Sequence, residues 1–398
     1  MDLKGKIKGL AASLQPYLVE CRSHLHRHPE LSFEEVNTSA FLVKVLEHHG
    51  ISYETGWAGH GISGLMSSEN MGNRIVALRA DMDALPIEEQ NECEYRSQNP
   101  GVMHACGHDV HMTWLIGALI ILNKLKEDWQ GSVKFIFQPG EEKLPGGAYQ
   151  MIQQGILQNP TPHLIIGQHV QPGMPVGTIG LKKGVFMASC DEIYLEIIGK
   201  GGHAALPHLC INPIPIAAQA IIALQTIVQS ENAPADSLVL SIGKLTTQGG
   251  ATNVIPERVY LEGTFRCLNE EQRLRILEKL EIELKELVND QGAILNINIK
   301  RGYPCLLNDE FSSQSIMEWA TDYLGEGHSL SLDSRLTSED FAYYSQQIPA
   351  VFYRTGIGRD ISVHHPRFDI DDRCLEIGAG LMAWLAIQHN AGNGNGNQ

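Results

Sequence analysis

The sequence lacks several patterns that mark large classes of proteins. No stretch approaches the roughly 20 apolar residues of a membrane-spanning helix, and the amino-terminal segment lacks the continuous apolar core of a signal peptide. No run of lysines or arginines stands out, and the formal net charge is −16. We therefore expect neither a membrane nor a nucleic acid as a partner.

Cysteine is sparse, and its spacing shows no disulfide framework. The chain has eight cysteines, and no two have CxxC spacing. This usage fits the reducing environment of the cytoplasm, where we expect the protein to work. The GxSxG turn that presents a nucleophilic serine is also absent, which disfavours a Ser/His/Asp hydrolase.

What the chain does have is length and a change of pattern along it. Its 398 residues exceed the roughly 250–300 that one hydrophobic core serves, so two domains are expected. Short apolar strands alternate with helices in residues 1–184 and again in 300–390. These two ranges predict one α/β domain whose central sheet is mixed, largely parallel and flanked by helices.

Residues 185–299 follow a different order, strand–helix–strand–strand–helix–strand. This is the order of a ferredoxin-like α+β domain, and we predict that it is inserted into the α/β domain. Its second helix places Leu274, Leu277, Leu280, Leu284 and Leu287 on one face. The Gly/Asn-rich tail, 391–398, is expected to be disordered.

One short stretch concentrates unusual chemistry. "GVMHACGHDVH", residues 101–111, sets Cys106 among several histidines, and Gly107 supplies a turn in which Cys106 and His108 can converge. Other such groups follow predicted strands, where an α/β sheet presents its sites. They are Asp81 and Asp83, Glu141 and Glu142, His169, and His364 and His365.

Each of these groups alone has an ordinary structural explanation. A glutamate pair is usually a solvated turn, a histidine after a strand is usually hydrogen-bonded, and a cysteine is often inert core. Together, four loops on one sheet edge carry Cys, His, Glu and His, which are the residue types that bind metals. A Cys106–histidine nucleophile is the competing chemistry, but it leaves the glutamate pair without a use.

At these residues the sequence resembles the dinuclear metallo-aminoacylase and carboxypeptidase G family. It is most similar to the branch of hippurate hydrolase, auxin-conjugate hydrolases and N-acetyl-diaminopimelate deacetylase. The matching motifs occur in order over nearly the whole chain: "LHRHPELSFEE", "RADMDALPI", "MHACGHDVHM", "FQPGEE", "GKGGHAALP", "NVIPE", "GTFR" and "HHPRFDI".

The resemblance implies two divalent metal ions per subunit, Zn²⁺ or Mn²⁺, with Co²⁺ or Ni²⁺ as further alternatives. The ligands carried over by position are Cys106, His108, Glu142, His169 and His364. His108 is implied as the ligand that bridges the metals, and Asp83 as a residue that orients a ligand. Glu141 is implied as the general base, because it stands beside the ligands without being one.

The resemblance also assigns roles in the inserted domain, which it makes a lid and dimerisation domain. His203, Asn253 and Arg266 would face the substrate, with Arg266 holding a carboxylate and His203 donating to the oxyanion. In the family this histidine reaches the partner subunit's site, so a homodimer is expected. Gly140, Lys143 and Leu144 depart from the residues usual in the branch, and the last two affect substrate preference.

The implied activity is a metal-dependent amidohydrolase that cleaves N-acyl-L-amino acids with N-acetyl, benzoyl or similar acyl groups. Two alternatives stay open on the sequence. One is a dipeptidase or aminopeptidase that uses the same dinuclear site. The other is a non-catalytic metal-binding protein, against which Glu141 argues because a closed structural site needs no additional carboxylate.

Overall fold

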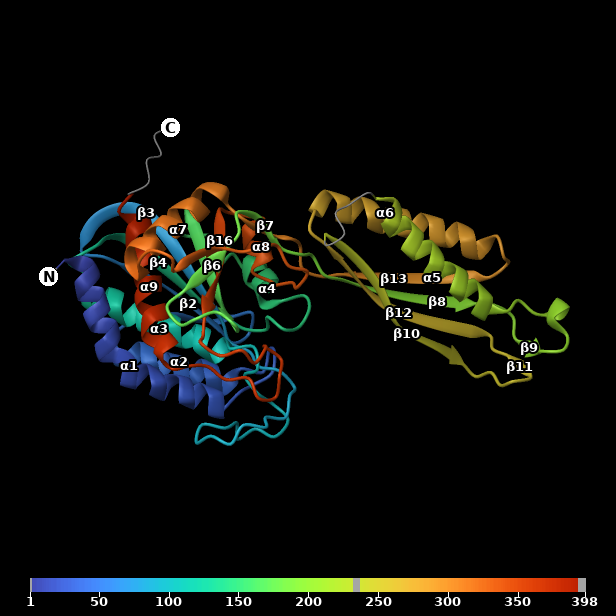
Figure 1. Ribbon diagram of the computed structural model, residues 1–398, viewed down its shortest axis with the longest axis horizontal. Coiled ribbons are helices and arrows are strands. Elements are labelled where there is room, and N and C mark those ends of the chain that lie inside the picture. The colour runs from blue at the N-terminus through green and yellow to red at the C-terminus, as the bar shows by residue number, and fades with distance from the viewer. Residues whose placement is uncertain (1, 232–236, 393–398) are drawn as a thin grey trace. The chain divides into compact units, whose positions relative to one another are not determined.

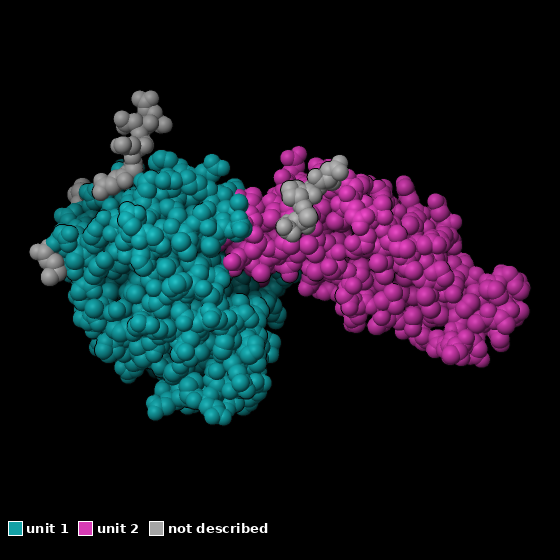
Figure 2. All heavy atoms as spheres, in the orientation of Figure 1, with its two compact units in different colours: residues 1–184, 307–333, 340–398 teal, residues 185–306, 334–339 magenta. Residues whose placement is uncertain are grey.

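The computed structural model describes residues 2–231 and 237–392. The chain divides into two compact units, coloured separately in Figure 2. The second unit comprises residues 185–306 and 334–339, and the first comprises the remainder. The predicted insertion, 185–299, lies within the second unit. Most of the tail predicted to be disordered lies outside the described residues.

The first unit is an α/β domain (Figure 1). Its helices are α1 Leu3–Arg27, α2 Val36–His48, α3 His108–Lys124, α4 Gly147–Gln153, α7 Glu310–Leu324, α8 Ala342–Ser345 and α9 Arg373–Asn390. Its sheet strands are β1 Glu54–Trp57, β2 Gly61–Ser67, β3 Asn70–Asp81, β4 Gln130–Gln138, β5 Leu164–Gln171, β6 Ile179–Leu181, β15 Ser329–Ser331 and β16 Ala350–Gly356. Two short strands, β7 Gly184–Met187 and β14 Leu306–Asn308, stand where the chain passes between the units.

The sheet order is β1-β2-β4-β3-β5-β16-β6-β15. The four central strands, β4, β3, β5 and β16, are parallel, while β2 and β6 run antiparallel to their central neighbours. Every residue of β16 is buried, as expected of a strand covered on both faces. The predicted mixed, largely parallel sheet is confirmed, and its parallel strands end at one common edge.

Helices α1, α3 and α9 pack against one another, and α3 and α9 also contact β3. The segment around "ALIILNKL", predicted as a buried helix, is the carboxyl-terminal part of α3, whose residues are buried up to Leu122. Gly117 explains why α3 and α9 can pack closely, because an added Cβ at this position would lie 2.6 Å from the Cβ of Ala379. Glycine therefore allows α3 and α9 to approach.

The second unit has the predicted ferredoxin-like element order. Its elements are β8 Asp191–Ile198, β9 Gly202–His203, a 3₁₀ turn Pro207–Leu209, α5 Pro213–Ser230, β10 Leu238–Gln248, β11 Val254–Ile255, β12 Arg258–Cys267, α6 Glu270–Asn289 and β13 Ile294–Arg301. The four long strands form an antiparallel sheet in the order β10-β12-β8-β13, and β9 pairs with β11 separately. Helices α5 and α6 cover one face of the sheet.

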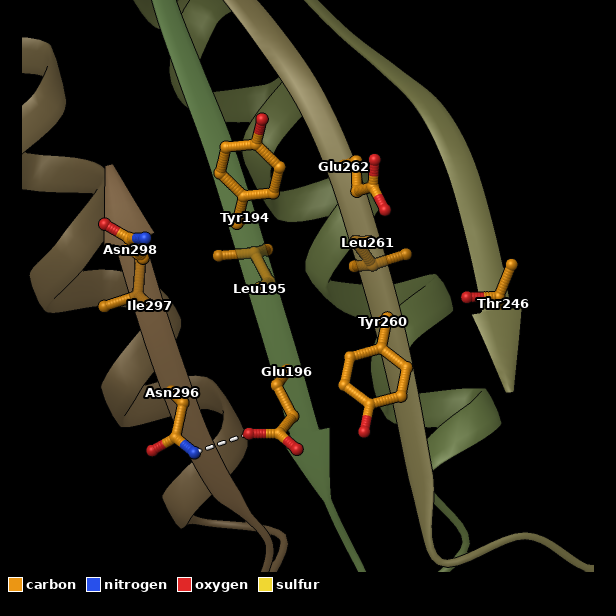
Figure 3. Close-up of a pocket in the computed structure, with 10 residues that line it drawn as sticks. All are labelled: Tyr194, Leu195, Glu196, Thr246, Tyr260, Leu261, Glu262, Asn296, Ile297 and Asn298. Atoms are coloured by element: carbon orange, nitrogen blue, oxygen red, sulfur yellow. Dashed lines mark hydrogen bonds between the residues drawn. The ribbon is translucent and has the colours of Figure 1, made fainter. Parts of the chain in front are cut away.

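The other face of this sheet is open. Tyr194, Glu196, Tyr260 and Asn296 project from it over a hollow of about 420 Å³, where the Asn296 amide donates to Glu196 (Figure 3). Along β8 buried residues alternate with partly exposed ones, as the alternating sequence predicts.

The helix predicted to bury five leucines needs one correction. In α6, Leu277, Leu280 and Leu284 are buried and Leu287 is partly buried against the same core. Leu274, however, is 43% exposed. The apolar face is continued by Ile276 and Val288 instead, because the 3.6-residue period shifts the buried stripe across the helix surface.

Helix α5 has the length and apolar composition that a membrane span would need. The core helix of a globular domain passes the same test, and α5 buries Ile216, Ala220 and Leu224 against the four-stranded sheet.

Candidate metal centre

The predicted cluster begins in the turn that leads into α3. Gly107 adopts the left-handed conformation, with φ of 83°, and α3 starts at His108 immediately after it. An added Cβ at this glycine would lie 2.7 Å from Cγ2 of Val170, so the turn packs directly against β5. Cys106 and His108 are thereby held at the carboxyl edge of the sheet, next to His169.

The structure brings the five predicted ligands together within the first unit. The Sγ of Cys106 lies 3.3 Å from Nε2 of His169 and 3.3 Å from Nε2 of His364. Oε1 of Glu142 lies 3.4 Å from Nε2 of His364 and 3.9 Å from Nε2 of His108. The five residues come from four separate loops or strand ends, as the sequence indicated, because Cys106 and His108 share one turn.

The histidine hydrogen bonds leave suitable nitrogens for a metal. Nδ1 of His169 lies 2.8 Å from the carbonyl oxygen of Val170, and Nδ1 of His108 lies 2.8 Å from that of Asp83. A carbonyl oxygen only accepts, so each Nδ1 carries the proton and each Nε2 presents a lone pair. Hydrogen bonds on the far nitrogen are the usual means of orienting metal-binding histidines.

Two further observations fit a cation at this place. Within the described residues, Nε2 of His108 and Oε1 of Glu142 are buried without a hydrogen-bond partner. Buried polar atoms are nearly always paired, so these two atoms fit a place where a cation binds. The sulfur, imidazole and carboxylate donors form the set that binds zinc and neighbouring transition metals.

The charges of the cluster agree with this reading. Burial raises the pKa of the Cys106 thiol well above its ordinary value, and the Glu142 and Glu141 carboxylates raise it further. Burial would lower the pKa of His108, but the carboxylates of Asp81 and Asp83 raise it to about 10. The carboxylate contributions to both shifts mean that positive charge is favoured here, which a bound divalent cation would supply.

The geometry argues against His108 as the bridging ligand. Its Nδ1 is engaged by Asp83, so the ring offers a single nitrogen. Two groups of donor atoms within 4.8 Å of one another consist only of predicted ligands, Cys106/His108/His169 and Cys106/Glu142/His364, and a third joins His108 and Glu142 to Glu141. The Cys106 sulfur is the donor that the first two groups share.

Asp83 contacts two of the predicted ligands. Besides its contact with His108, its Oδ2 accepts a hydrogen bond of 2.9 Å from the backbone N–H of Glu142 and one of 2.6 Å from Oγ of Ser32. The orienting contact implied for Asp83 therefore has a physical counterpart, and it reaches the glutamate turn as well as the imidazole.

Glu141 lies beside the ligands. Its side chain is buried, at 6% exposed, and its carboxylate shares a group with His108 and Glu142. Its Oε1 accepts from the backbone N–H of Asp340 at 3.4 Å. Successive glutamates thus place one carboxylate against His108 and His364 and the other against the Asp340 amide.

A buried charged network near the site has no counterpart in the sequence predictions. Arg79 donates to Asp81 and to Asp340, each at 2.7 Å. Asp81 accepts from Nδ1 of His111 at 2.6 Å, and Nε2 of His111 accepts from the backbone N–H of Val170 at 2.9 Å. Both nitrogens of His111 are occupied, so it supports the site from behind and does not bind metal. "RADMD" and "HDVH" contained the signal, as charged residues inside apolar segments.

The histidines that the sequence left unassigned are mostly accounted for by other partners. His365 accepts from the backbone N–H of Arg367, which leaves His364 as the member of that pair in the cluster. His26 is buried between Asp109 and Glu89. His104 is buried, and neither of its nitrogens has a partner within the described residues.

The three residues predicted to face the substrate lie in the second unit. His203, in β9, and Asn253 are exposed neighbours, joined by the hydrogen bond from Ala204 N–H to the Asn253 carbonyl. Arg266, near the end of β12, is half-buried and donates to Oγ of Ser338 at 2.7 Å. The second unit therefore holds these residues in two separate places.

Comparisons with known proteins agree with this site. Residues 77–388 match the model of peptidase family M20/M25/M40. The chain is 39% identical to the N-acetyl-L-cysteine deacetylase of Bacillus subtilis over 92% of its length and 86% of that protein. It is also 39% identical to the N-acyl-L-amino acid amidohydrolase of Geobacillus stearothermophilus, over 77% of this chain and 81% of that protein.

A solved structure is similar over almost the whole chain. The YXEP protein of Bacillus subtilis, described as a dinuclear metal binding peptidase from the M20 family, superposes with a TM-score of 0.83 and 32% identity. The alignment covers 96% of this chain and 99% of that one. The sequence, the fold and the clustered donors lead to one conclusion: the chain is a hydrolase that belongs to peptidase family M20/M25/M40.

Proposed function

We propose that this enzyme is a metal-dependent amidohydrolase that releases the acyl group from N-acyl-L-amino acids. The observation that carries the proposal is the position of Glu141, a buried carboxylate that accepts from the Asp340 amide and lies beside His108 and Glu142. Relatives whose names specify N-acetyl-L-cysteine and N-acyl-L-amino acids support this class of substrate.

The metal ligands in this proposal are Cys106, His108, Glu142, His169 and His364, with Cys106 as the common donor in place of His108. Two divalent cations held by these residues would polarise the scissile carbonyl and make a water molecule more acidic. The thiolate donor favours Zn²⁺, with Mn²⁺ as the alternative that a measurement of metal content decides. The raised pKa of the Cys106 thiol argues against its acting as a nucleophile on its own.

Glu141 moves the proton in this reaction. Its carboxylate takes a proton from the attacking water as the water oxygen bonds to the carbonyl carbon. It then gives that proton to the leaving nitrogen as the C–N bond breaks, which yields a carboxylic acid and an amino acid, and the acid releases the second water proton to solvent. The Asp340 amide and Asp83 hold Glu141 and His108 in place during both transfers.

In the second unit we assign Arg266 to the α-carboxylate of the substrate, because a guanidinium matches a carboxylate in a two-bond fork. Asn253 and His203 are assigned to the substrate carbonyl, where His203 donates to the developing oxyanion. We propose that this unit acts as a lid and a dimerisation domain.

The dimer is supported by the spacing of these residues. In the β8–β12 ladder, Arg258 pairs with Ile198, close to β9 and His203. Arg266 is eight residues farther along β12, a strand length of about 27 Å. Because one chain holds His203 and Arg266 so far apart, we propose that His203 serves the site of a second copy. Exposed Ile214 and Ile222 on α5 provide an apolar face for that contact.

The cysteines support a reducing compartment, and we propose the cytoplasm. All eight are unpaired, and Cys106 must stay reduced to act as a ligand.

Glu141→Gln tests the proposal directly. The amide keeps the shape of the side chain but cannot accept the water proton, so we expect about two metal ions per chain to remain and kcat to fall by about 10²–10⁴-fold. Metal content is measured by mass spectrometry and turnover by amine release. The wild-type enzyme treated with a chelator is the control and should regain activity with Zn²⁺ or Mn²⁺. Near-wild-type turnover of Glu141→Gln would contradict the proposal.

The choice of substrate needs a panel of N-acetyl, N-benzoyl and indole-acyl amino acids set against simple dipeptides. Hydrolysis of the acyl amino acids alone supports the amidohydrolase. Preferential hydrolysis of the dipeptides would replace it with a dipeptidase that uses the same residues.

A further inference from the structure

A buried carboxylate close to the glutamate turn has no role in the reaction described above. Glu35 follows the "ELSFE" stretch, directly precedes α2 and is 0% exposed. Its Oε1 accepts from the backbone N–H of Gly140 at 2.8 Å and from that of Phe33 at 3.0 Å. Its Oε2 is buried without a partner within the described residues. Such a group costs stability, so its presence calls for a reason.

Glu35 holds the residue immediately before the general base. The N–H of Gly140 is bonded to Glu35, and its carbonyl accepts from the N–H of Gly147 at 2.9 Å. Gly140 has φ of 63°, and an added Cβ would lie 2.4 Å from the ring of Phe33. The backbone before Glu141 is therefore fixed by hydrogen bonds on both sides and by an aromatic ring.

The same segment also holds the residue after the general base. Ser32 donates to Asp83 at 2.6 Å, and Asp83 accepts from the backbone N–H of Glu142 at 2.9 Å. Glu141 thus lies between two amides that the stretch from Ser32 to Glu35 fixes, one directly and one through Asp83. This stretch is more than 100 residues away in the sequence.

We propose that Glu35 is a positioning residue for the reaction, which holds the Gly140–Glu142 turn so that Glu141 faces the water and Glu142 faces the metal. The inference rests on the roles proposed above for Glu141 and Glu142. Glu35 touches neither substrate nor metal in this proposal and acts only through the Gly140 amide.

The state of the carboxyl supports the choice of test variant. Burial and the nearby Asp83 carboxylate raise the pKa of Glu35 to about 7. A glutamine has the shape of the protonated acid, and its carbonyl oxygen can accept both backbone N–H groups. Glu35→Gln should therefore preserve the turn, whereas Glu35→Ala leaves two buried N–H groups without an acceptor.

Glu30 provides a matched control. It belongs to the same segment and accepts from the backbone N–H groups of Asn37 and Thr38, at 3.1 and 2.8 Å, at the start of α2. Its side chain is not bonded to the glutamate turn. Glu30→Ala should lower the melting temperature and leave kcat unchanged, which shows the effect of losing a backbone acceptor alone.

The experiment measures kcat, KM and Zn²⁺ affinity for Glu35→Ala, Glu35→Gln and Glu30→Ala with the best substrate of the panel. For Glu35→Ala we expect kcat and Zn²⁺ affinity to fall by about 10–100-fold, with KM little changed. Glu35→Gln should stay within about threefold of wild type in both, because the hydrogen bonds that position the turn remain. Wild-type kcat and Zn²⁺ affinity in Glu35→Ala, whatever its stability, would overturn the inference.

Two further measurements keep the result decisive. If Glu35→Ala does not fold, Glu35→Asp replaces it, since a carboxylate one methylene shorter retreats from the Gly140 amide. The same fall in kcat is then expected, and unchanged kcat would refute the role. Glu141→Gln distinguishes failure of the proposed function from failure of this inference. If Glu141→Gln remains active, the proposed function fails. If Glu141→Gln is inactive while the kcat of Glu35→Ala equals that of Glu30→Ala, only this inference fails.

Discussion

The central strand β16 of the first unit's sheet is buried on both faces, whereas the sheet of the second unit is covered on one face only. β16 is buried at every residue, but β8 alternates between buried and partly exposed residues. The groups assigned to the reaction follow this difference. Cys106, His108 and Glu141 are buried at the edge of the first sheet, while His203 is exposed.

In the proposed function, the buried groups of the first unit carry out the reaction and the more exposed groups of the second unit recognise the substrate. Charge interacts strongly in a buried, low-dielectric space, so that donors placed there bind a cation and change each other's pKa values. Exposed groups interact weakly with one another and remain available to a ligand or a second chain. If this division is correct, changes in the two units should have different signatures.

The largest expected effect comes from combining two inactive chains. Glu141→Gln disables the first unit and His203→Ala the second, and each homodimer should be nearly inactive. Co-expressed in equal amounts, half of the dimers contain one intact Glu141 facing an intact His203 of the partner, so activity should recover to about a quarter of wild type. Activity is measured on the whole co-expressed mixture, purified without separating its three kinds of dimer. No recovery would mean that His203 acts within its own chain, and the proposal that it serves the site of a second copy would be wrong.

A smaller effect is expected from Arg266→Ala. Loss of the guanidinium should raise KM for N-acyl amino acids about tenfold, with metal content and kcat little changed, since one charged hydrogen-bonding pair is lost. Steady-state kinetics on an N-acetyl amino acid and on its amide, which lacks the carboxylate, provides the measurement. Equal losses on both compounds would show that Arg266 does not bind the carboxylate.

The smallest effect concerns the pH dependence of stability. Burial, followed by the charges of Arg74 and His163, lowers the pKa of His389 in the first unit to about 4. The unfolded chain binds this proton near pH 6.5, so the free energy of unfolding is highest above pH 6.5 and falls as the pH drops towards 4.

His389→Gln checks this expectation in chelator-treated protein. Urea unfolding at pH 7.5 and pH 5 should show that the variant loses about 2 kcal/mol less than wild type between these values. An identical loss in both proteins would remove His389 as a cause and place the pH dependence elsewhere in the first unit.

The sequence predicted the parts of the fold and site that local patterns encode. Apolar strands followed by Glu142, His169 and His364 indicate a shared edge, because parallel strands end together, and Cys106 lies in a histidine-rich turn before a helix. The ferredoxin-like insertion follows from its element order. These features depend on hydrophobic periods and on residue types that have few other uses.

What the sequence did not predict depends on contacts between distant residues. Nothing around Glu35 indicates that its acceptor oxygen reaches Gly140, and the pairing of Asp81 with His111 is equally invisible in a single sequence. The bridging role predicted for His108 depends on a contact of the same kind. Resemblance assigns a ligand to His108 by position, but only the bond between its Nδ1 and Asp83 shows that one nitrogen remains.

The loop that carries His364 has a consequence for metal loading. His364 adopts φ of 65°, a strained conformation for a residue other than glycine, and its backbone N–H bonds to the carbonyl of Ala105 at 2.8 Å. A backbone hydrogen bond therefore fixes the loop of His364 to Ala105, the residue next to Cys106. Because the backbone fixes this loop, a metal ion that binds has little loop disorder to remove. Competing metals are then distinguished by how well they match the sulfur, nitrogen and oxygen donors. The exchange of one metal for another requires no refolding.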